Sequence, residues 1–268
     1  MKYDGFIFDV DGVLIDTSQS FNSAVLEAVT FISGSDRFTL NEIRKLKSIT
    51  GFNNDWHVTI AGVCWAKFDP NTSFDGFIEK IQLYGSGITG IRKFQPKLTP
   101  SIESHITRIC KEAYGGSTAC KQLYNFEPSN IEHKGHWLKE TPLISQMSLI
   151  RLIPLAGIFT GRSSEEMELG FDILKWRIPP NRTSVSDDED FDKPNPEKLI
   201  NLIDELECVT SIYFGDSFDD LQTVQNYRQK TGRSMEFCYI STTNDFDGWD
   251  FIAPSVNAFI AERKISDD

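Results

Sequence analysis

Short apolar runs that end in polar residues recur along the chain, and they predict the buried strands of a parallel sheet. The first run, at 5–8, is followed directly by aspartates, and four later runs have the same character. Strands that are covered on both faces have nearly continuous apolar sequences of this kind. We therefore predict five strands, at 5–8, 155–160, 183–187, 211–215 and 236–240.

Helix start signals follow three of these runs. Ser163 with Glu166 three residues later is the pattern of a capping box, Pro196 follows a capping asparagine, and Ser217 precedes an acidic first turn. Strand, turn and helix alternating in this way are typical of an open α/β sheet. The fold class that we predict is α/β, with a Rossmann-like three-layer core built on a parallel sheet.

The segment 18–150 breaks this alternation, because it has a helical period almost throughout and offers no convincing buried strand. We predict an all-helical cap domain over 18–150, inserted into an α/β core that comprises 1–17 and 151–268. Glycines at 85–87 and 115–117 are the predicted joints within it. The predicted helices are 19–32, 39–48, 55–67, 74–84, 101–113 and 138–150.

Composition and charge limit the classes of partner. The 268 residues include 27 Lys and Arg against 39 Asp and Glu, a formal net charge of −12. An acidic chain repels nucleic acid and anionic lipid alike, so we expect neither as a partner. A small anionic substrate needs a locally positive site or a metal.

The cysteines and the apolar runs predict the compartment. Five cysteines are scattered without a Cys-x-x-Cys pair, which favours a reducing cytoplasm. The start of the chain lacks the pattern of a signal peptide, and the longest apolar region, 143–160, is interrupted by Gln146, Arg151 and Pro154. We expect a cytoplasmic protein that does not span a membrane, and the sequence leaves its oligomeric state open.

Chemically active residues gather in four short segments, 9–12, 160–162, 192–194 and 215–220. Each lies at or near the carboxyl end of a predicted strand, and those ends share one edge of a parallel sheet, where ligands bind. Four or five carboxylates, one lysine and one hydroxyl would meet there. Carboxylates at such density repel one another unless a divalent cation lies among them. Since every donor in the set is oxygen, Mg²⁺ is the expected ion.

In this order the four segments resemble the motifs of the haloacid-dehalogenase-like (HAD) hydrolases, most of which are Mg²⁺-dependent phosphatases. Phe-Asp-Val-Asp-Gly-Val-Leu-Ile-Asp at 8–16 and Gly-Asp-Ser-Phe-Asp-Asp at 215–220 carry most of the resemblance, which covers 1–17 and about 152–261. An insertion between the first and second motifs is similar to the helical cap of one branch of the family. The resemblance implies a phosphatase that hydrolyses a small phosphomonoester through an aspartyl-phosphate.

The resemblance also implies roles for single residues. Asp9 is expected to be the nucleophile, and Asp11 is expected to protonate the leaving alkoxide and then to activate water. Thr160 and the backbone N–H of Gly161 are expected to bind phosphoryl oxygens, and Lys193 to balance their charge.

The resemblance places Mg²⁺ on four aspartates. The expected ligands are the carboxylates of Asp9 and Asp216 and the main-chain carbonyl of Asp11, with Asp220 binding directly or through water. Asp219 is interpreted as a helix-dipole residue.

Within the predicted cap, the segment 47–57 is rich in polar side chains and contains one glycine. We interpret Lys47, Asn53, Asn54 and His57 as substrate-specificity residues, because adjacent asparagines offer donors and acceptors that suit the hydroxyls of a sugar or polyol phosphate. The alternative is that Asn53 and Asn54 only cap the helix that begins at Asp55.

Several further alternatives stay open. A sugar phosphomutase would use the same aspartyl-phosphate and cap, and a non-catalytic phosphate-ligand-binding protein could adopt the same fold. Asp187 is interpreted as a loop residue, with membership of the metal shell as the alternative. His133 and His136 resemble a metal-binding pair but lack further ligands nearby in the sequence.

Overall fold

The computed structural model describes residues 3–52, 54–187 and 193–263, and the chain divides into two compact units. We call 1–17 together with 140–268 the α/β unit and 18–139 the helical unit. The second stretch of the α/β unit begins at Glu140, earlier than the residue 151 that the sequence predicts. Within the described ranges, no helix combines the length and the apolar character needed to cross a membrane.

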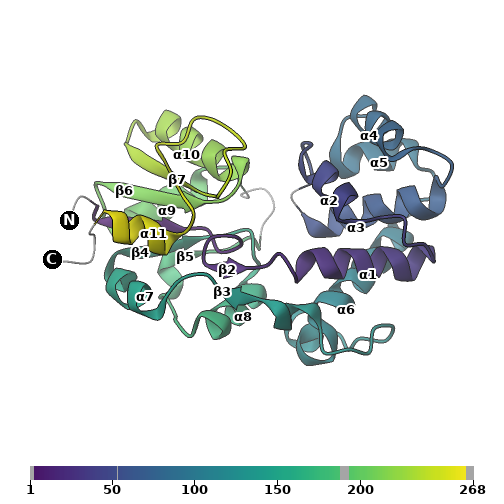
Figure 1. Ribbon diagram of the computed structural model, residues 1–268, viewed down its shortest axis with the longest axis horizontal. Helices are drawn as coiled ribbons and strands as arrows, with labels where there is room; N and C mark the ends of the chain where they lie inside the picture. Colours follow the sequence, from purple (N-terminus) through teal and green to yellow (C-terminus); the bar gives the residue numbers. More distant parts are fainter. Residues whose placement is uncertain (1–2, 53, 188–192, 264–268) are drawn as a thin grey trace. The chain divides into compact units, whose positions relative to one another are not determined.

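The α/β unit is built on a parallel sheet (Figure 1). The sheet has six strands in the order β5-β4-β1-β6-β7-β8. All five predicted strands are present, although the one predicted at 183–187 is limited to two residues. Strand β8 was not predicted, because three residues at a sheet edge are too few to display a period. The strands are β1 Gly5–Phe8, β4 Ala156–Phe159, β5 Thr183–Ser184, β6 Ser211–Gly215, β7 Met235–Ile240 and β8 Phe251–Ala253.

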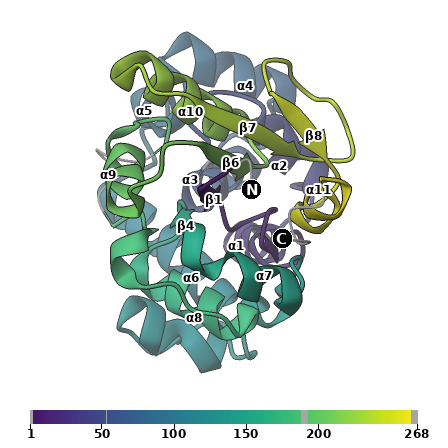
Figure 2. The ribbon, with the colours of Figure 1, turned by 90° about the vertical axis from the view of Figure 1, so that its left-hand side faces the viewer.

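Side chains of the central strands alternate between two hydrophobic cores, which makes the unit three-layered. Phe6 and Phe8 of β1 pack into one core with side chains of α8 and α11, whereas Ile7 packs into the other with α9 and α10. Figure 2 shows these two pairs of helices on opposite sides of the strands. The predicted Rossmann-like core is confirmed. The helices are α7 Gln146–Leu152, α8 Ser164–Leu174, α9 Glu197–Leu206, α10 Phe218–Thr231 and α11 Val256–Glu262, with 3-10 turns at Ile153–Leu155 and Pro180–Arg182.

A short antiparallel ribbon joins the two places where the chain leaves and re-enters the α/β unit. In it β2 (Ile15–Asp16) pairs with β3 (Thr141–Pro142). The prediction of one helix over 138–150 is therefore wrong. Proline lacks a backbone N–H and disfavours a helical conformation at the residue before it, so Pro142 prevents a continuous helix there.

The helical unit contains helices without a strand among its described residues, as the sequence predicts for this segment. Helix α1 packs against α3 and α6, and the rings of Phe21 and Tyr114 stack with their centroids 4.4 Å apart. Helix α5 was not predicted, because its first residue, Gly87, lies in a predicted joint. The elements are α1 Phe21–Ser33, α2 Leu40–Lys47, α3 Asp55–Val63, a π-helical turn Cys64–Phe68, α4 Phe74–Leu83, α5 Gly87–Phe94, α6 Pro100–Tyr124 and a 3-10 turn His136–Lys139.

The second predicted joint, at 115–117, is a kink inside α6. Gly116 has φ +56°, and a Cβ at this residue would lie 2.1 Å from the backbone nitrogen of Gly135. Glycine is required here for two reasons, because the backbone is left-handed and because another segment of backbone touches it.

Candidate active site

Three aspartates at the carboxyl ends of two neighbouring strands form an acidic cluster in the α/β unit. Asp9 follows β1, and Asp216 and Asp220 follow β6, which lies beside β1 in the sheet. One carboxylate oxygen from each residue lies within 4.8 Å of the other two. The strand order therefore brings together side chains that lie more than 200 positions apart in the sequence.

Lys193 contacts two of these carboxylates. Its Nζ lies 2.9 Å from Oδ1 of Asp9 and 2.7 Å from Oδ1 of Asp220. Burial lowers the pKa of Lys193, but the Asp220 and Asp9 carboxylates outweigh this effect and raise the pKa well above its usual value. Lys193 is thus a charged ammonium in direct contact with Asp9, as the sequence predicts.

Three carboxylates of the acidic cluster lie together with the one ammonium of Lys193. Burial raises the pKa of Asp9 to about 7; the Lys193 ammonium opposes this rise, while Asp220 and Asp11 add to it. Crowding by protein atoms, together with the Asp9 and Asp220 carboxylates, raises the pKa of Asp216 well above its usual value, even though solvent reaches its side chain. Repulsion of this kind is what a bound cation relieves.

Gly12 allows the first loop to approach Asp216 closely. Its φ is +72°, and a Cβ built on it would lie only 2.0 Å from Oδ2 of Asp216. A side chain at position 12 would therefore collide with a carboxylate of the cluster. The glycine between β1 and β2 is needed for the shape of the site as well as for the backbone conformation.

Asp220 is held rigidly by hydrogen bonds to both of its oxygens. Oδ1 accepts a hydrogen bond from Lys193 and another, of 2.9 Å, from the hydroxyl of Tyr213. Oδ2 accepts from the backbone N–H and the hydroxyl of Ser217, at 3.1 and 2.6 Å, which completes the capping box of α10. The contact of Tyr213 with Asp220 was not predicted, because a tyrosine inside an apolar strand is expected to be a core residue.

The predicted phosphate-binding residues lie in the loop between β4 and α8. Thr160 is buried, its Oγ1 accepts a hydrogen bond of 3.2 Å from the backbone N–H of Arg162, and its own N–H donates to Ser184. No atom lies within 4 Å of a Cβ built on Gly161, so space is open beside that backbone. The capping box predicted at Ser163 is confirmed. An open loop at the start of a helix suits an anion.

Asp187 has a local structural role. It accepts a hydrogen bond of 2.8 Å from the backbone N–H of Ser164 and another from the hydroxyl of the same residue, both at the start of α8. These contacts tie Asp187 to the first turn of α8, and a role in the metal shell stays untested.

The donor set of the acidic cluster fits a small divalent cation. All of its side-chain donors are carboxylate oxygens, which Mg²⁺ prefers. Three carboxylates beside one lysine favour a bound cation, and the absence of a side chain at Gly12 leaves room for the Asp216 carboxylate. The carboxylate of Asp11, in contrast, accepts hydrogen bonds from Arg162.

The predicted specificity residues lie in the helical unit and make local contacts there. Nζ of Lys47 lies 2.7 Å from Oδ1 of Asp55, and Asn54 accepts a hydrogen bond of 2.9 Å from the backbone N–H of Trp56 as the N-cap of α3. His57 is half-buried in the first turn of α3. Asn53 lies outside the described residues.

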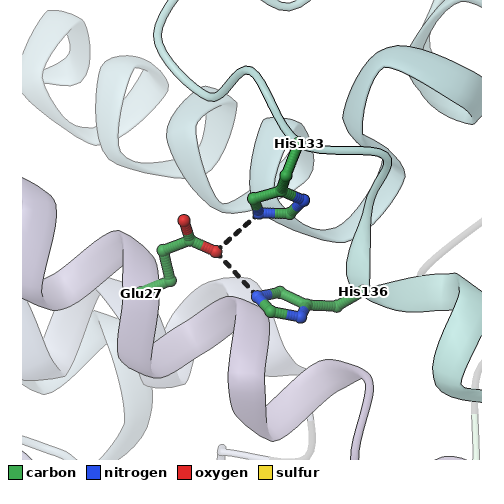
Figure 3. A group of neighbouring side chains, drawn as sticks. All are labelled: Glu27, His133 and His136. Atoms are coloured by element: carbon green, nitrogen blue, oxygen red, sulfur yellow. Dashed lines mark hydrogen bonds and ion pairs between the residues drawn. The ribbon is translucent and has the colours of Figure 1, made fainter.

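A second group of possible metal ligands, Glu27, His133 and His136, lies within the helical unit (Figure 3). Oε2 of Glu27 lies 2.8 Å from Nε2 of His133 and 2.7 Å from Nε2 of His136. Nδ1 of His133 accepts a hydrogen bond from the backbone N–H of Gly135, so in neutral His133 the proton is on Nε2. As described, Glu27 is linked to both imidazole rings by side-chain hydrogen bonds.

Comparison with solved structures shows that the fold is shared with known hydrolases. Phosphatase Tt82 from Thermococcus thioreducens matches over 97% of this chain and 99% of its own, with 24% identity and a TM-score of 0.72. CbbY from Rhodobacter sphaeroides in complex with phosphate matches over 94% of both chains, with 17% identity and a TM-score of 0.55. A hydrolase from Pseudomonas syringae matches over 98% of both chains, with 14% identity and a TM-score of 0.53.

No family model matches the sequence, and no curated protein matches it. The similarity to solved structures extends over nearly the whole chain, the helical unit included. The α/β fold with a helical insertion, which the motif resemblance implied, is therefore confirmed.

Proposed function

We propose that this protein is a Mg²⁺-dependent phosphatase that hydrolyses a small phosphomonoester through an aspartyl-phosphate on Asp9. One observation carries the proposal: Nζ of Lys193 lies 2.9 Å from the Asp9 carboxylate and 2.7 Å from that of Asp220, so a nucleophile, a fixed cation and a group of oxygen donors are in direct contact. The shared fold with a phosphatase and with a phosphate-bound protein supports the same reaction class.

Asp9 and Asp11 divide the covalent chemistry between them. A carboxylate oxygen of Asp9 attacks phosphorus; the bond from phosphorus to that oxygen forms while the bond to the alkoxide leaving group breaks. Asp11 gives its proton to the departing oxygen. In the second half, Asp11 takes a proton from water, which attacks phosphorus and restores the Asp9 carboxylate with release of inorganic phosphate.

The metal ligands in this proposal are the carboxylates of Asp9 and Asp216 and the main-chain carbonyl of Asp11. Bound Mg²⁺ supplies positive charge to the phosphoryl oxygens. Both oxygens of Asp220 already accept hydrogen bonds, which favours contact through water for that residue.

Charge on the transferring group is also balanced by the protein. Thr160 and the backbone N–H of Gly161 bind phosphoryl oxygens at the start of α8, and the Lys193 ammonium lies against the nucleophile. The burial of Thr160 and Lys193 keeps water from competing for these interactions.

For the substrate class we propose a sugar or polyol phosphate. The residues that we propose to recognise it lie in the helical unit and are Lys47, Asn53, Asn54 and His57. Amide and imidazole groups donate and accept hydrogen bonds as hydroxyl-bearing substrates require. Because Asn54 also caps α3, its contribution to specificity has to be separated experimentally from its contribution to helix stability.

The reaction is tested by measuring inorganic phosphate released from a panel of sugar, polyol, nucleotide and aryl phosphates, with Mg²⁺ or with EDTA. Asp9→Asn should abolish release, because an amide is not a nucleophile here. Asp4→Asn is the matched control: Asp4 lies at the other end of β1 and accepts hydrogen bonds from the backbone N–H groups of Val209 and Thr210. It should retain activity.

Two results would contradict a phosphatase. Isomerised sugar phosphate without release of inorganic phosphate would identify a phosphomutase. Binding of phosphate ligands with neither reaction would identify a non-catalytic binding protein.

A further inference from the structure

Arg162 is a fully buried arginine that links Asp11 to a second carboxylate. Its side chain is 0% exposed. Nε and Nη2 both donate to Oδ1 of Asp11, at 2.8 and 2.7 Å, and Nη2 also lies 2.8 Å from Oε2 of Glu140. Nη1 is 3.4 Å from the main-chain oxygen of Glu166 in α8. The planar guanidinium is thus fixed by partners on several sides.

The charges of this network balance within the protein interior. The Glu140 side chain is also 0% exposed, whereas that of Asp11 is 36% exposed. A buried guanidinium requires a buried counter-charge, and Glu140 supplies it. Arg162 therefore donates its N–H groups to Asp11 while Glu140 neutralises the guanidinium, so the carboxyl group is fixed without the addition of a net positive charge.

Asp11 would be loosely held without this pair. Its backbone is already constrained, because the N–H of Gly12 donates to the carbonyl of Ile15 at 2.9 Å. The side chain, however, is partly open to solvent and can rotate. Since both guanidinium hydrogen bonds go to Oδ1, the other oxygen, Oδ2, is the one available to exchange a proton.

We propose that Arg162 is a positioning residue for proton transfer by Asp11, and that Glu140 holds the guanidinium in place. This inference rests on the proposed function, in which Asp11 protonates the leaving alkoxide. In that step the O–H bond at Oδ2 breaks, the proton moves to the leaving oxygen, and the bond from that oxygen to phosphorus breaks. Arg162 contributes by orienting Oδ2 of Asp11 toward the leaving oxygen, and it neither gives nor takes a proton.

The test variant replaces both charged partners, Arg162→Met together with Glu140→Met. Removal of the arginine alone would leave Glu140 buried without its counter-charge, which can unfold the protein, whereas apolar replacement of a whole buried pair is often tolerated. The matched control is Arg177→Met with Glu168→Met, an ion pair of the same residue types in the same unit whose side chains are 57% and 51% exposed.

The measurement is kcat/KM for two substrates, an alkyl phosphate and p-nitrophenyl phosphate. This parameter reports the phosphoryl transfer to Asp9, before water enters. An alkoxide needs a proton as it leaves and p-nitrophenolate does not. Since general acid catalysis contributes about 10²–10⁴-fold, kcat/KM should fall about 100-fold for the alkyl phosphate and less than about 5-fold for the aryl phosphate. The control pair should change neither value by more than about 2-fold.

A second experiment tests whether the loss of kcat/KM on the alkyl phosphate depends on Asp11. In an Asp11→Asn background the Arg162→Met/Glu140→Met replacement should cause no further loss on the alkyl phosphate, because the group that it positions is gone. Equal losses on both substrates, or a further loss in the Asp11→Asn background, would overturn the inference and leave the phosphatase proposal intact. Absence of Mg²⁺-dependent turnover in the wild-type protein would refute both.

Discussion

Replacement of Gly12 by alanine tests whether the close approach between the first loop and Asp216 determines activity. The added Cβ would lie 2.0 Å from Oδ2 of Asp216, whereas such contacts are essentially never shorter than about 3 Å. The carboxylate, the loop or both must therefore move by about 1 Å. A misplacement of that size in a reacting assembly costs about 100-fold in rate, which corresponds to about 2.7 kcal/mol.

Backbone strain has to be separated from this collision. Gly12 has φ +72°, and alanine in a left-handed conformation costs about 1–2 kcal/mol of stability wherever it occurs. Gly232, at the end of α10, has φ +69° with no atom within 4 Å of a Cβ built on it. Gly232→Ala therefore carries the same strain without the collision.

The assay measures kcat/KM for an alkyl phosphate across a Mg²⁺ titration, together with thermal unfolding of each variant. Both variants should lose similar stability, and only Gly12→Ala should lose about 100-fold in kcat/KM. If Gly12→Ala keeps its activity within about threefold of Gly232→Ala, the reasoning that ties Gly12 to Asp216 is refuted.

Three further predictions concern the helical unit. Burial raises the pKa of Glu112, but hydrogen bonds to its carboxylate, including one from the N–H of Asn130, bring the pKa below its usual value. The ionised carboxylate therefore stabilises the fold above about pH 4.5, and this stabilisation is lost as the pH falls further. Glu112→Gln should therefore lower the unfolding free energy by about 2 kcal/mol at pH 7, with a smaller difference near pH 3.5 in chemical denaturation; a deficit independent of pH would contradict this. Glu27→Ala should lower the unfolding free energy by about 2 kcal/mol, because His133 donates a hydrogen bond to Glu27. The loss should be the same with Zn²⁺ and with EDTA, and a larger loss with Zn²⁺ would indicate a metal site. Asn54→Ser keeps a capping oxygen, whereas Asn54→Ala removes it at a cost of about 1 kcal/mol, so only the alanine variant should lower the melting temperature. If the Asn54 amide binds substrate, both variants should change KM among sugar and polyol phosphates. Unchanged KM values would show that Asn54 acts only as a helix cap.

Local sequence patterns predicted the parts of the fold that depend on neighbouring residues. The run Gly5–Phe8 is apolar throughout because its side chains enter two cores in turn, and this produces a strand signal that can be recognised without a structure. The start of α8 was predicted equally well, since a capping box involves only Ser163 and Glu166, three positions apart.

The features that could not be predicted depend on contacts between distant segments. Arg162 and Asp11 are separated by 151 positions, and Glu140 lies in a stretch whose pattern suggested a helix. A buried arginine and a solvated one look the same in a sequence. The signal available in the sequence was the position of Arg162, two residues after Thr160, which is predicted to bind phosphate.

The pairing of β2 with β3 has a consequence for how such proteins change in evolution. Asp16 lies opposite Thr141 in the ribbon, and paired strands run about 5 Å apart, so the whole insertion begins and ends at nearly the same point of the α/β unit. A hairpin turn could close that gap. A segment attached in this way can be lengthened, exchanged or deleted without altering the register of the sheet. Selection can therefore replace the part proposed to choose the substrate while the acidic cluster is inherited unchanged.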